Sequence, residues 1–288
     1  MTSYNPKEWF SFIFQFHKGD TFRKLLPIMI GIGVYSWLIA YLELEYWQLS
    51  QNSHVKNITV MHTMLGFVIS LLLVFRTNTA YDRWWEGRKA WGALVNNSRN
   101  LAMKLSVILK DKEDKDYFRK FIPAYAAILN QHLKNVDVNH ELFDDSTLSA
   151  DHYKHKPNQI AKNIISKIHE LYAANKITGD QLITLNPEVQ SFTDICGVCE
   201  RIKNTPIPYS YSAFIKKFIF LYVMTLPFGY VFQLGYYVIP IVVMIFYVLA
   251  SLELIAEEIE DPFGNDPNDL PTEKIADNIR KNIEELIY

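Results

Sequence analysis

The chain has little cysteine and no excess of charge of either sign. Of its 288 residues, two are cysteines, so a disulfide framework like that of small secreted domains is excluded. The 29 basic and 31 acidic residues give a formal net charge of −2, which argues against a nucleic-acid partner. The N-terminus lacks a basic start followed by an apolar run, so we expect no cleavable signal peptide.

The sequence also lacks the short motifs of common catalytic centres. There is no nucleophile elbow, phosphate-binding loop or HExxH motif, and we predict a protein that is not an enzyme and holds no cofactor. Cys196 and Cys199 have CxxC spacing. A redox site of that kind needs a βαβ context, and a zinc site needs two further ligands. We therefore interpret the pair as structural.

Long uncharged stretches are the main positive feature. A helix of about 20 apolar residues crosses the hydrocarbon core of a bilayer. Residues 218–252 carry no charge but are too long for one crossing, and Gln233-Leu234-Gly235 in their middle indicates a tight turn. We predict a polytopic membrane protein with four transmembrane helices, at residues 25–42, 57–75, 218–233 and 236–252.

Charges that flank these stretches predict their orientation. Arg and Lys residues lie before the first stretch and after the second, at Arg23, Lys24, Arg76 and Arg83, whereas the linker 50–57 holds one Lys. Because cytoplasmic flanks are enriched in Lys and Arg, we predict that the N- and C-termini are both cytoplasmic. Trp84, Trp85 and Trp91 suit the membrane boundary.

The remaining chain reads as helical and aqueous in composition. No alternation typical of strands is sustained, so we predict an all-α fold with a helical cytosolic region at 78–211. Within it we expect helices at 90–109, 118–133, 160–175 and 188–203, and a loop at 136–157. We expect residues 1–24 to form an amphipathic interfacial helix, with a buried N-terminal arm on the soluble part as the alternative. We expect residues 256–288 to form an acidic cytosolic C-terminal tail.

Three large apolar residues repeat along the second stretch. Phe67, Leu71 and Phe75 follow i, i+4, i+8 spacing and share one helical face. In a symmetric oligomer they would form stacked rings, a constriction that gates by expelling water. Packing of this face against other membrane helices is the alternative.

Carboxylates cluster near the C-terminus around Pro262-Phe263-Gly264. Glu258, Asp261, Asp266 and Asp269 are ligands of the kind that a hard cation such as Ca²⁺ requires, although the spacing is not that of an EF-hand loop. A solvated acidic tail is the alternative. His152 and His155 lie on a polar stretch without a partner motif, and we interpret them as solvated.

The segment from Phe75 to Gly92 reads FRTNTAYDRWWEGRKAWG and resembles the bacterial branch of the bestrophin family. Further similar segments follow in the family's order. They are Cys199-Glu-Arg with Thr205-Pro-Ile-Pro, Leu226-Pro-Phe, and Glu258-Ile-Glu-Asp-Pro-Phe-Gly with Asn268-Asp-Leu-Pro.

The resemblance implies a bestrophin-like homopentameric ion channel in a bacterial inner membrane. One bestrophin-like channel domain would span residues 1–288, with the lipid bilayer, permeant monovalent ions and further copies of the chain as partners. Phe67, Leu71 and Phe75 would line the hydrophobic neck, and Asp180, Gln181 or a neighbour the cytosolic exit. A ring of Asp180 carboxylates would favour cations.

The resemblance leaves the permeant ion and the trigger open. Animal members conduct chloride and open with Ca²⁺, whereas bacterial relatives favour monovalent cations such as Na⁺ and K⁺. Asn265, Pro267 and Asn268 interrupt the acidic run that binds Ca²⁺ in animal members. Two other functions stay open, a non-conducting membrane-anchored scaffold for a cytosolic partner and a membrane enzyme that uses His152, His155 or the acidic tail.

Overall fold

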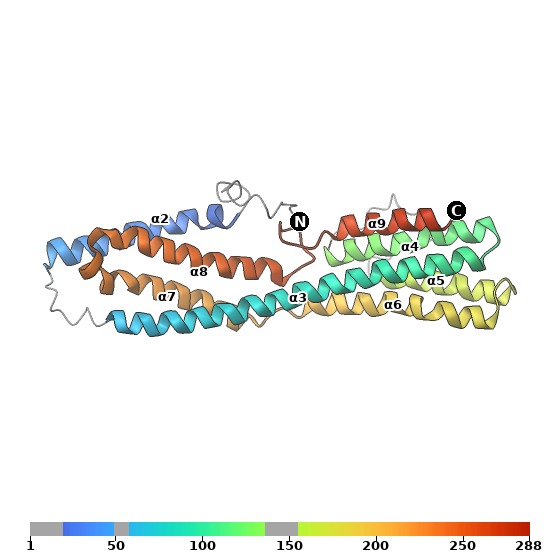
Figure 1. Ribbon diagram of the computed structural model, residues 1–288, viewed down its shortest axis with the longest axis horizontal. Coiled ribbons are helices and arrows are strands. Elements are labelled where there is room, and N and C mark those ends of the chain that lie inside the picture. The colour runs from blue at the N-terminus through green and yellow to red at the C-terminus, as the bar shows by residue number, and fades with distance from the viewer. Residues whose placement is uncertain (1–19, 49–57, 136–154) are drawn as a thin grey trace. The chain divides into compact units, whose positions relative to one another are not determined.

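The computed structural model describes residues 20–48, 58–135 and 155–288, and these residues form helices without strands (Figure 1). The all-α prediction is therefore confirmed for this part of the chain. The elements are α2 (Asp20–Tyr41), a π-helical turn η1 (Leu42–Tyr46), α3 (Ile58–Ile108), α4 (Lys112–Leu133), α5 (Lys156–Ala173), α6 (Gly179–Asn204), α7 (Tyr209–Leu234), a 3₁₀ turn η4 (Gly235–Tyr237), α8 (Val238–Glu260) and α9 (Thr272–Leu286). Most of the predicted interfacial helix at 1–24, the linker 50–57 and most of the loop at 136–157 lie outside the described residues, and residues 20–24 form the start of α2.

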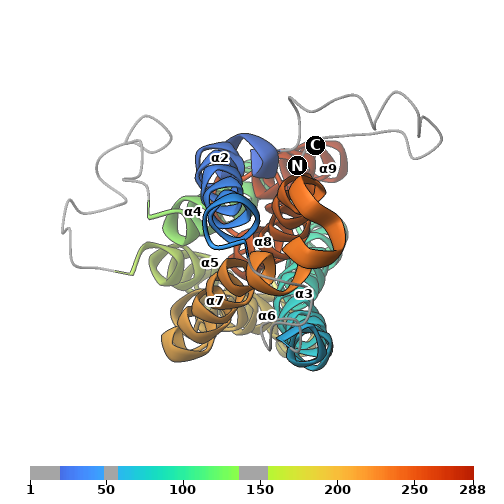
Figure 2. The same ribbon diagram turned by 90° about the vertical axis from the view of Figure 1, so that its left-hand side faces the viewer.

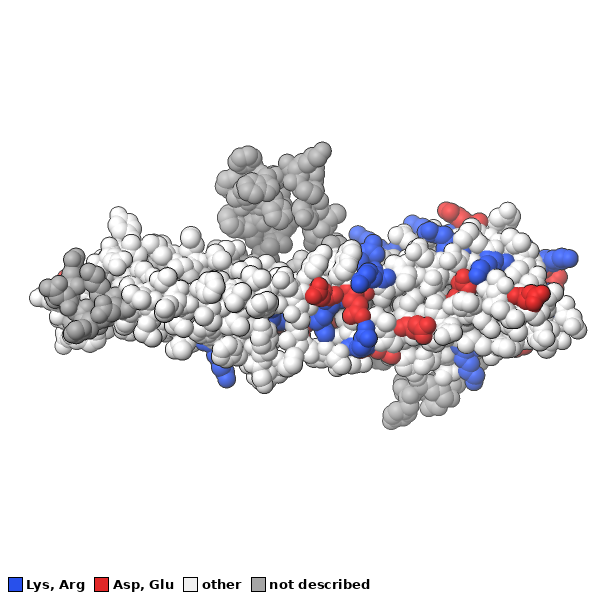
Figure 3. Space-filling model, turned by 60° about the horizontal axis from the view of Figure 1, so that its bottom comes forward, with Lys and Arg blue, Asp and Glu red and all other residues white. Residues whose placement is uncertain are grey.

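The chain divides into two compact units, and α3 contributes to both. The apolar unit comprises Thr2–Asp82 and Pro206–Glu260, and the polar unit comprises Arg83–Thr205 and Asp261–Tyr288. On the face drawn in Figure 3, charged side chains are sparse over the apolar unit and gather over the polar unit.

The apolar unit is built from α2, the first part of α3, α7 and α8. Helix α8 packs against both α2 and α7, and the end-on view in Figure 2 shows these three helices together. Ile32, Leu73, Val223 and Phe246 are among the residues of its core. Within the described residues, the stretches Thr21–Tyr46, Ile58–Ile108 and Tyr209–Glu260 are long and apolar enough to cross a membrane.

The turn between α7 and α8 lies where the sequence predicted it. Gly235 has a φ of +56°, a conformation that glycine adopts without the steric cost of a Cβ atom. The uncharged run from Phe218 to Leu252 is therefore divided between two helices, α7 and α8.

Helix α3 differs from the prediction, because it continues without a break for 51 residues. The sequence predicted a membrane helix ending at Phe75 and a separate helix beginning at Ala90. Residues 76–89 change from apolar to polar, but they contain no proline and a single glycine, Gly87. A change of polarity alone does not end a helix, since the backbone hydrogen bonds need only residues that tolerate helical dihedrals.

The polar unit has its own core, formed by the second part of α3 with α4, α5, α6 and α9. Trp91, Phe118 and Tyr125 are fully buried in it. The Tyr125 ring stacks on Phe192 with centroids 4.9 Å apart, and its hydroxyl donates to the Phe192 carbonyl oxygen at 2.5 Å. These contacts join α4 to α6.

Two further helices of this unit, α6 and α9, differ from the sequence-based predictions. Helix α6 begins at Gly179 and contains Pro187, whereas the sequence predicts a helix that begins at Glu188. The residues called an acidic tail include α9, which buries Ile279 and Ile283 in the polar core. No helix was predicted there from the sequence, although a charged segment forms one when one of its faces is apolar.

Candidate functional site

Phe67, Leu71 and Phe75 lie along the side of α3 that faces away from the core of the apolar unit. In the single chain their exposed fractions are 71%, 45% and 55%, whereas Ile69 and Leu73 on the opposite side are 1% and 2% exposed. One helix therefore presents a line of large apolar side chains, and this line needs a partner outside the chain or a lipid environment.

A buried ion pair follows this line directly. Arg76 is 1% exposed, and its Nη2 lies 2.7 Å from Oε2 of Glu260, while its Nε lies 3.4 Å from Oε1 of Glu253. Glu260 also accepts a hydrogen bond from the backbone N–H of Ile207 at 2.6 Å. A buried charge requires such partners, so Arg76 holds α3 to α8 next to Phe75. From the sequence, Arg76 was used only to predict orientation, and these two glutamates were not identified.

The residues predicted for the cytosolic exit lie in the first turn of α6. Gln181 forms a capping box with Thr178, in which the Thr178 N–H donates to Gln181 Oε1 at 2.9 Å and the Gln181 N–H donates to Thr178 Oγ1 at 3.3 Å. The Gln181 side chain thus has a local role at the helix start. Asp180 is exposed, and so is Ile183, an apolar neighbour with 69% exposure.

The carboxylates of the acidic turn make contacts of two kinds. In the apolar unit Glu258 pairs with Lys24 at 3.0 Å. In the polar unit Asp269 is buried, and its Oδ2 accepts a hydrogen bond from the Asp266 N–H at 2.6 Å. A Cβ atom at Gly264 would lie 2.8 Å from that same oxygen, which explains the glycine. No three side-chain carboxylates of this turn gather within the described residues, and the Ca²⁺ site stays a prediction.

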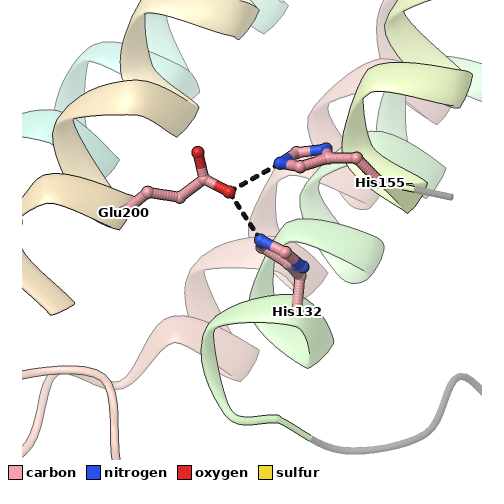
Figure 4. A group of neighbouring side chains, drawn as sticks. All are labelled: His132, His155 and Glu200. Atoms are coloured by element: carbon pink, nitrogen blue, oxygen red, sulfur yellow. Dashed lines mark hydrogen bonds and ion pairs between the residues drawn. The ribbon is translucent and has the colours of Figure 1, made fainter. Parts of the chain in front are cut away.

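A different cluster is assembled from three separate helices of the polar unit (Figure 4). His132 lies in the last turn of α4, His155 is the N-cap of α5, and Glu200 lies on α6. The Nε2 atoms of both histidines lie 2.6 Å from Oε1 of Glu200. Among the described residues, this is the one group of three His, Cys, Asp or Glu side chains close enough to share a metal ion.

His155 was predicted to be solvated, but its side chain instead contacts Glu200 within this cluster. Burial raises the pKa of Glu200, but the hydrogen bonds and charges of His155 and His132 outweigh it, so the pKa of this carboxyl lies below its ordinary value. His152 lies outside the described residues. No local sequence motif joins the three residues, and their convergence depends on helix packing.

The cysteine pair is buried in α6 and forms no disulfide. Burial raises the pKa of the Cys196 and Cys199 thiols to about 12 in each case. Because the thiolate is the reactive form, neither cysteine is suited to redox or nucleophilic chemistry near neutral pH. This agrees with the structural interpretation.

Comparison with known families and curated proteins gives consistent matches. Residues 1–285 match the family model described as "Bacterial/Fungal Bestrophin protein". The voltage-dependent anion channel-forming protein alr2987 of Nostoc sp. is 36% identical over 97% of this chain and 92% of its own length. The voltage-dependent anion channel-forming protein YneE of Escherichia coli K12 is 29% identical over 95% of this chain and 90% of its own length.

Solved structures show the same fold. A crystal structure of a bacterial bestrophin homologue from Klebsiella pneumoniae superposes with a TM-score of 0.82 at 24% identity, covering 90% of this chain and 97% of that one. A crystal structure described as a membrane protein has a TM-score of 0.84 at 25% identity, covering 91% and 98%.

Proposed function

Because the chain belongs to the bacterial and fungal bestrophin family, we propose that it forms a membrane channel whose neck is lined by Phe67, Leu71 and Phe75. The family is one of channel-forming proteins and not of enzymes, as the sequence predicted. The observation that carries the neck assignment is the exposure of these three side chains on a helix whose opposite face is buried.

Helix geometry supports a neck of stacked rings. Residues four apart are separated by about 6 Å along the axis of an α-helix, so copies of α3 around a common axis would form three successive apolar rings. A passage without polar groups binds water weakly and empties readily, which blocks ions when it is narrow. A lipid-facing role would also suit apolar side chains, and the experiment below separates the two.

The pore requires several copies, because one chain supplies one wall. We take the homopentamer from the family resemblance, together with four membrane helices per subunit, a bacterial inner membrane and cytoplasmic termini. The buried pair of Arg76 with Glu260 would hold α3 against α8 and so keep the neck residues turned toward the axis.

We propose that the permeant ions are small and monovalent, and that anions are the first candidate. The curated relatives are named as anion channel-forming proteins. An uncharged neck selects by the cost of removing water from an ion and not by the sign of its charge, so charged groups elsewhere decide selectivity. The second candidate is a cation preference, favoured by the exposed Asp180 in the first turn of α6.

The neck is tested by ion flux into liposomes that contain the purified full chain. We expect Phe67→Ala, Leu71→Ala and Phe75→Ala together to increase flux, because smaller rings leave a wider passage that stays wet. The matched control is Leu221→Ala with Met244→Ala, two exposed apolar positions on α7 and α8 and not on α3. Flux that is the same in the triple variant and wild type would contradict the neck.

Planar-bilayer recording under a salt gradient tests the channel and its selectivity together. The sign of the reversal potential separates anion from cation permeability directly. If the purified protein gives no unitary currents, the membrane-anchored scaffold becomes the better explanation.

A further inference from the structure

We infer that His132, His155 and Glu200 form a binding site for a divalent transition-metal ion, with Zn²⁺ the best match. The inference is independent of the proposed pore, since all three residues belong to the polar unit and none is a predicted neck or exit residue.

The geometry brings three donors of the right kind to one point. Figure 4 shows both imidazole rings directed at the same carboxylate oxygen from two different helices. Their ring centroids are 4.6 Å apart, and each Nε2 lies 2.6 Å from Glu200 Oε1. One ligand atom from each residue can be chosen so that all three lie within 4.8 Å of one another.

The donor set favours Zn²⁺ over the common hard cations. Two imidazole nitrogens and one carboxylate oxygen, with a fourth position for water, form a three-ligand zinc set found in proteins. Ca²⁺ and Mg²⁺ prefer oxygen ligands throughout. Each of the three side chains is about one third exposed, at 33%, 32% and 29%, so an ion and its water ligand have access.

Binding requires a small local adjustment. Tetrahedral zinc with bonds of about 2.1 Å places its ligand atoms about 3.4 Å apart, so each nitrogen must move away from the carboxylate oxygen by less than about 1 Å. Side-chain rotation at a helix end and at an N-cap supplies this movement without repacking the core.

The positions of the ring protons are consistent with replacement of the hydrogen bonds to Glu200 by metal ligation. The Nδ1 of His155 accepts a hydrogen bond from the Asn158 N–H at 3.2 Å, so Nε2 carries the proton that it donates to Glu200. For Nε2 to bind a metal, the single ring proton must leave Nε2 and be taken up at Nδ1 from solvent, so that the neutral imidazole binds through its Nε2 lone pair. The Asn158 N–H lies at the exposed start of α5 and turns to water, as free N–H groups of a first helical turn do.

A bound ion would join the end of α4, the start of α5 and the body of α6. Because a ligand that binds only the folded protein stabilises it, zinc should raise the thermal midpoint of the purified chain.

The test is Zn²⁺ titration of the full chain, purified in detergent and stripped of metal by a chelator. We expect one tight Zn²⁺ per chain and a higher thermal midpoint with zinc. Affinity should fall at least tenfold in His132→Ala, in His155→Ala and in Glu200→Gln. The control is His169→Ala, an exposed histidine of α5 outside the cluster, which should bind zinc as wild type does.

Circular dichroism and gel filtration check that each variant is folded. If an alanine variant does not fold, two other measurements test the site. One is zinc binding by Glu200→Gln, which keeps the side-chain volume, and the other is the visible spectrum of Co²⁺-loaded wild type. Intense d–d absorption of a four-coordinate Co²⁺ supports the site. The proposal is overturned if zinc does not bind stoichiometrically, if folded cluster variants bind as well as wild type, or if Co²⁺ gives the weak spectrum of an octahedral aqua ion.

Discussion

The guanidinium of Arg76 and the carboxylate of Glu260 form a buried ion pair, with Nη2 and Oε2 2.7 Å apart. Arg76 directly follows Phe75 on α3, and Glu260 is the last residue of α8. The pair therefore fixes the position of one helix against another at the end of the line of exposed apolar residues. A second carboxylate, Glu253, shares the same guanidinium at 3.4 Å.

We expect Arg76→Gln to lower the stability of the chain by about 3–5 kcal/mol, because it leaves two glutamates without their cation in a buried setting. The control is Arg280→Gln, since Arg280 pairs with Asp277 at the surface, where both side chains are more than half exposed. An exposed pair of this kind contributes at most about 1 kcal/mol. Thermal unfolding in detergent measures the stability of both variants. Equal losses of stability would contradict the larger contribution expected of the buried pair.

Asp180→Asn should shift the reversal potential toward anion permeability, because it removes one carboxylate per subunit from the proposed exit. Gln181→Ala should instead leave the reversal potential unchanged and cost about 1 kcal/mol of stability through loss of part of the capping box. Bilayer recording and thermal unfolding separate the two effects. An unchanged potential in Asp180→Asn would place Asp180 away from the ion path and favour Ile183.

The two cysteines should resist thiol reagents in the folded protein. Cys196 and Cys199 are buried, and burial raises the pKa of each thiol to about 12, so the thiolate is scarce at neutral pH. We expect negligible labelling of the folded chain by iodoacetamide and labelling of both residues after denaturation, as measured by mass spectrometry. Rapid labelling without denaturant would contradict this result.

Asp114 should make the polar unit sensitive to acid. Its carboxylate is 4% exposed and contacts Lys167 at 3.0 Å and Lys176 at 2.5 Å. Burial raises its pKa, but the hydrogen bonds and charges of the two lysines outweigh burial and leave the pKa below the ordinary 3.8. Since the folded pKa is the lower one, this stabilisation is present above pH 3.8 and is lost as the pH falls through the folded value.

The variant Asp114→Asn tests whether the stabilisation by this carboxylate is lost as the pH falls. At neutral pH we expect it to destabilise the chain by about 2 kcal/mol, the scale of hydrogen bonds to a charged group. The difference in thermal midpoint between wild type and variant should shrink as the pH falls below 3.8. A difference that stays constant through this range would show that the Asp114 charge contributes nothing.

Several helix boundaries were missed although their signals lie in the sequence. Thr178 and Gln181 have the spacing of a capping box, and this pair starts α6 ahead of Pro187. Ile275, Ile279 and Ile283 repeat every four residues and mark the apolar face of α9. Both signals lie within segments rich in charged residues, where overall composition indicates a polar loop or tail and only the local spacing indicates a helix.

The sequence by itself determined the long uncharged helices, the turn at Gly235 and the shared helical face of Phe67, Leu71 and Phe75. Each of these depends on residues close together in the chain, where backbone geometry fixes the outcome. Tertiary structure alone decided which face of α3 is buried, which carboxylates meet Arg76, and that His132 and His155 converge on Glu200. Such contacts join distant segments, and they depend on how whole helices pack, which local spacing does not specify.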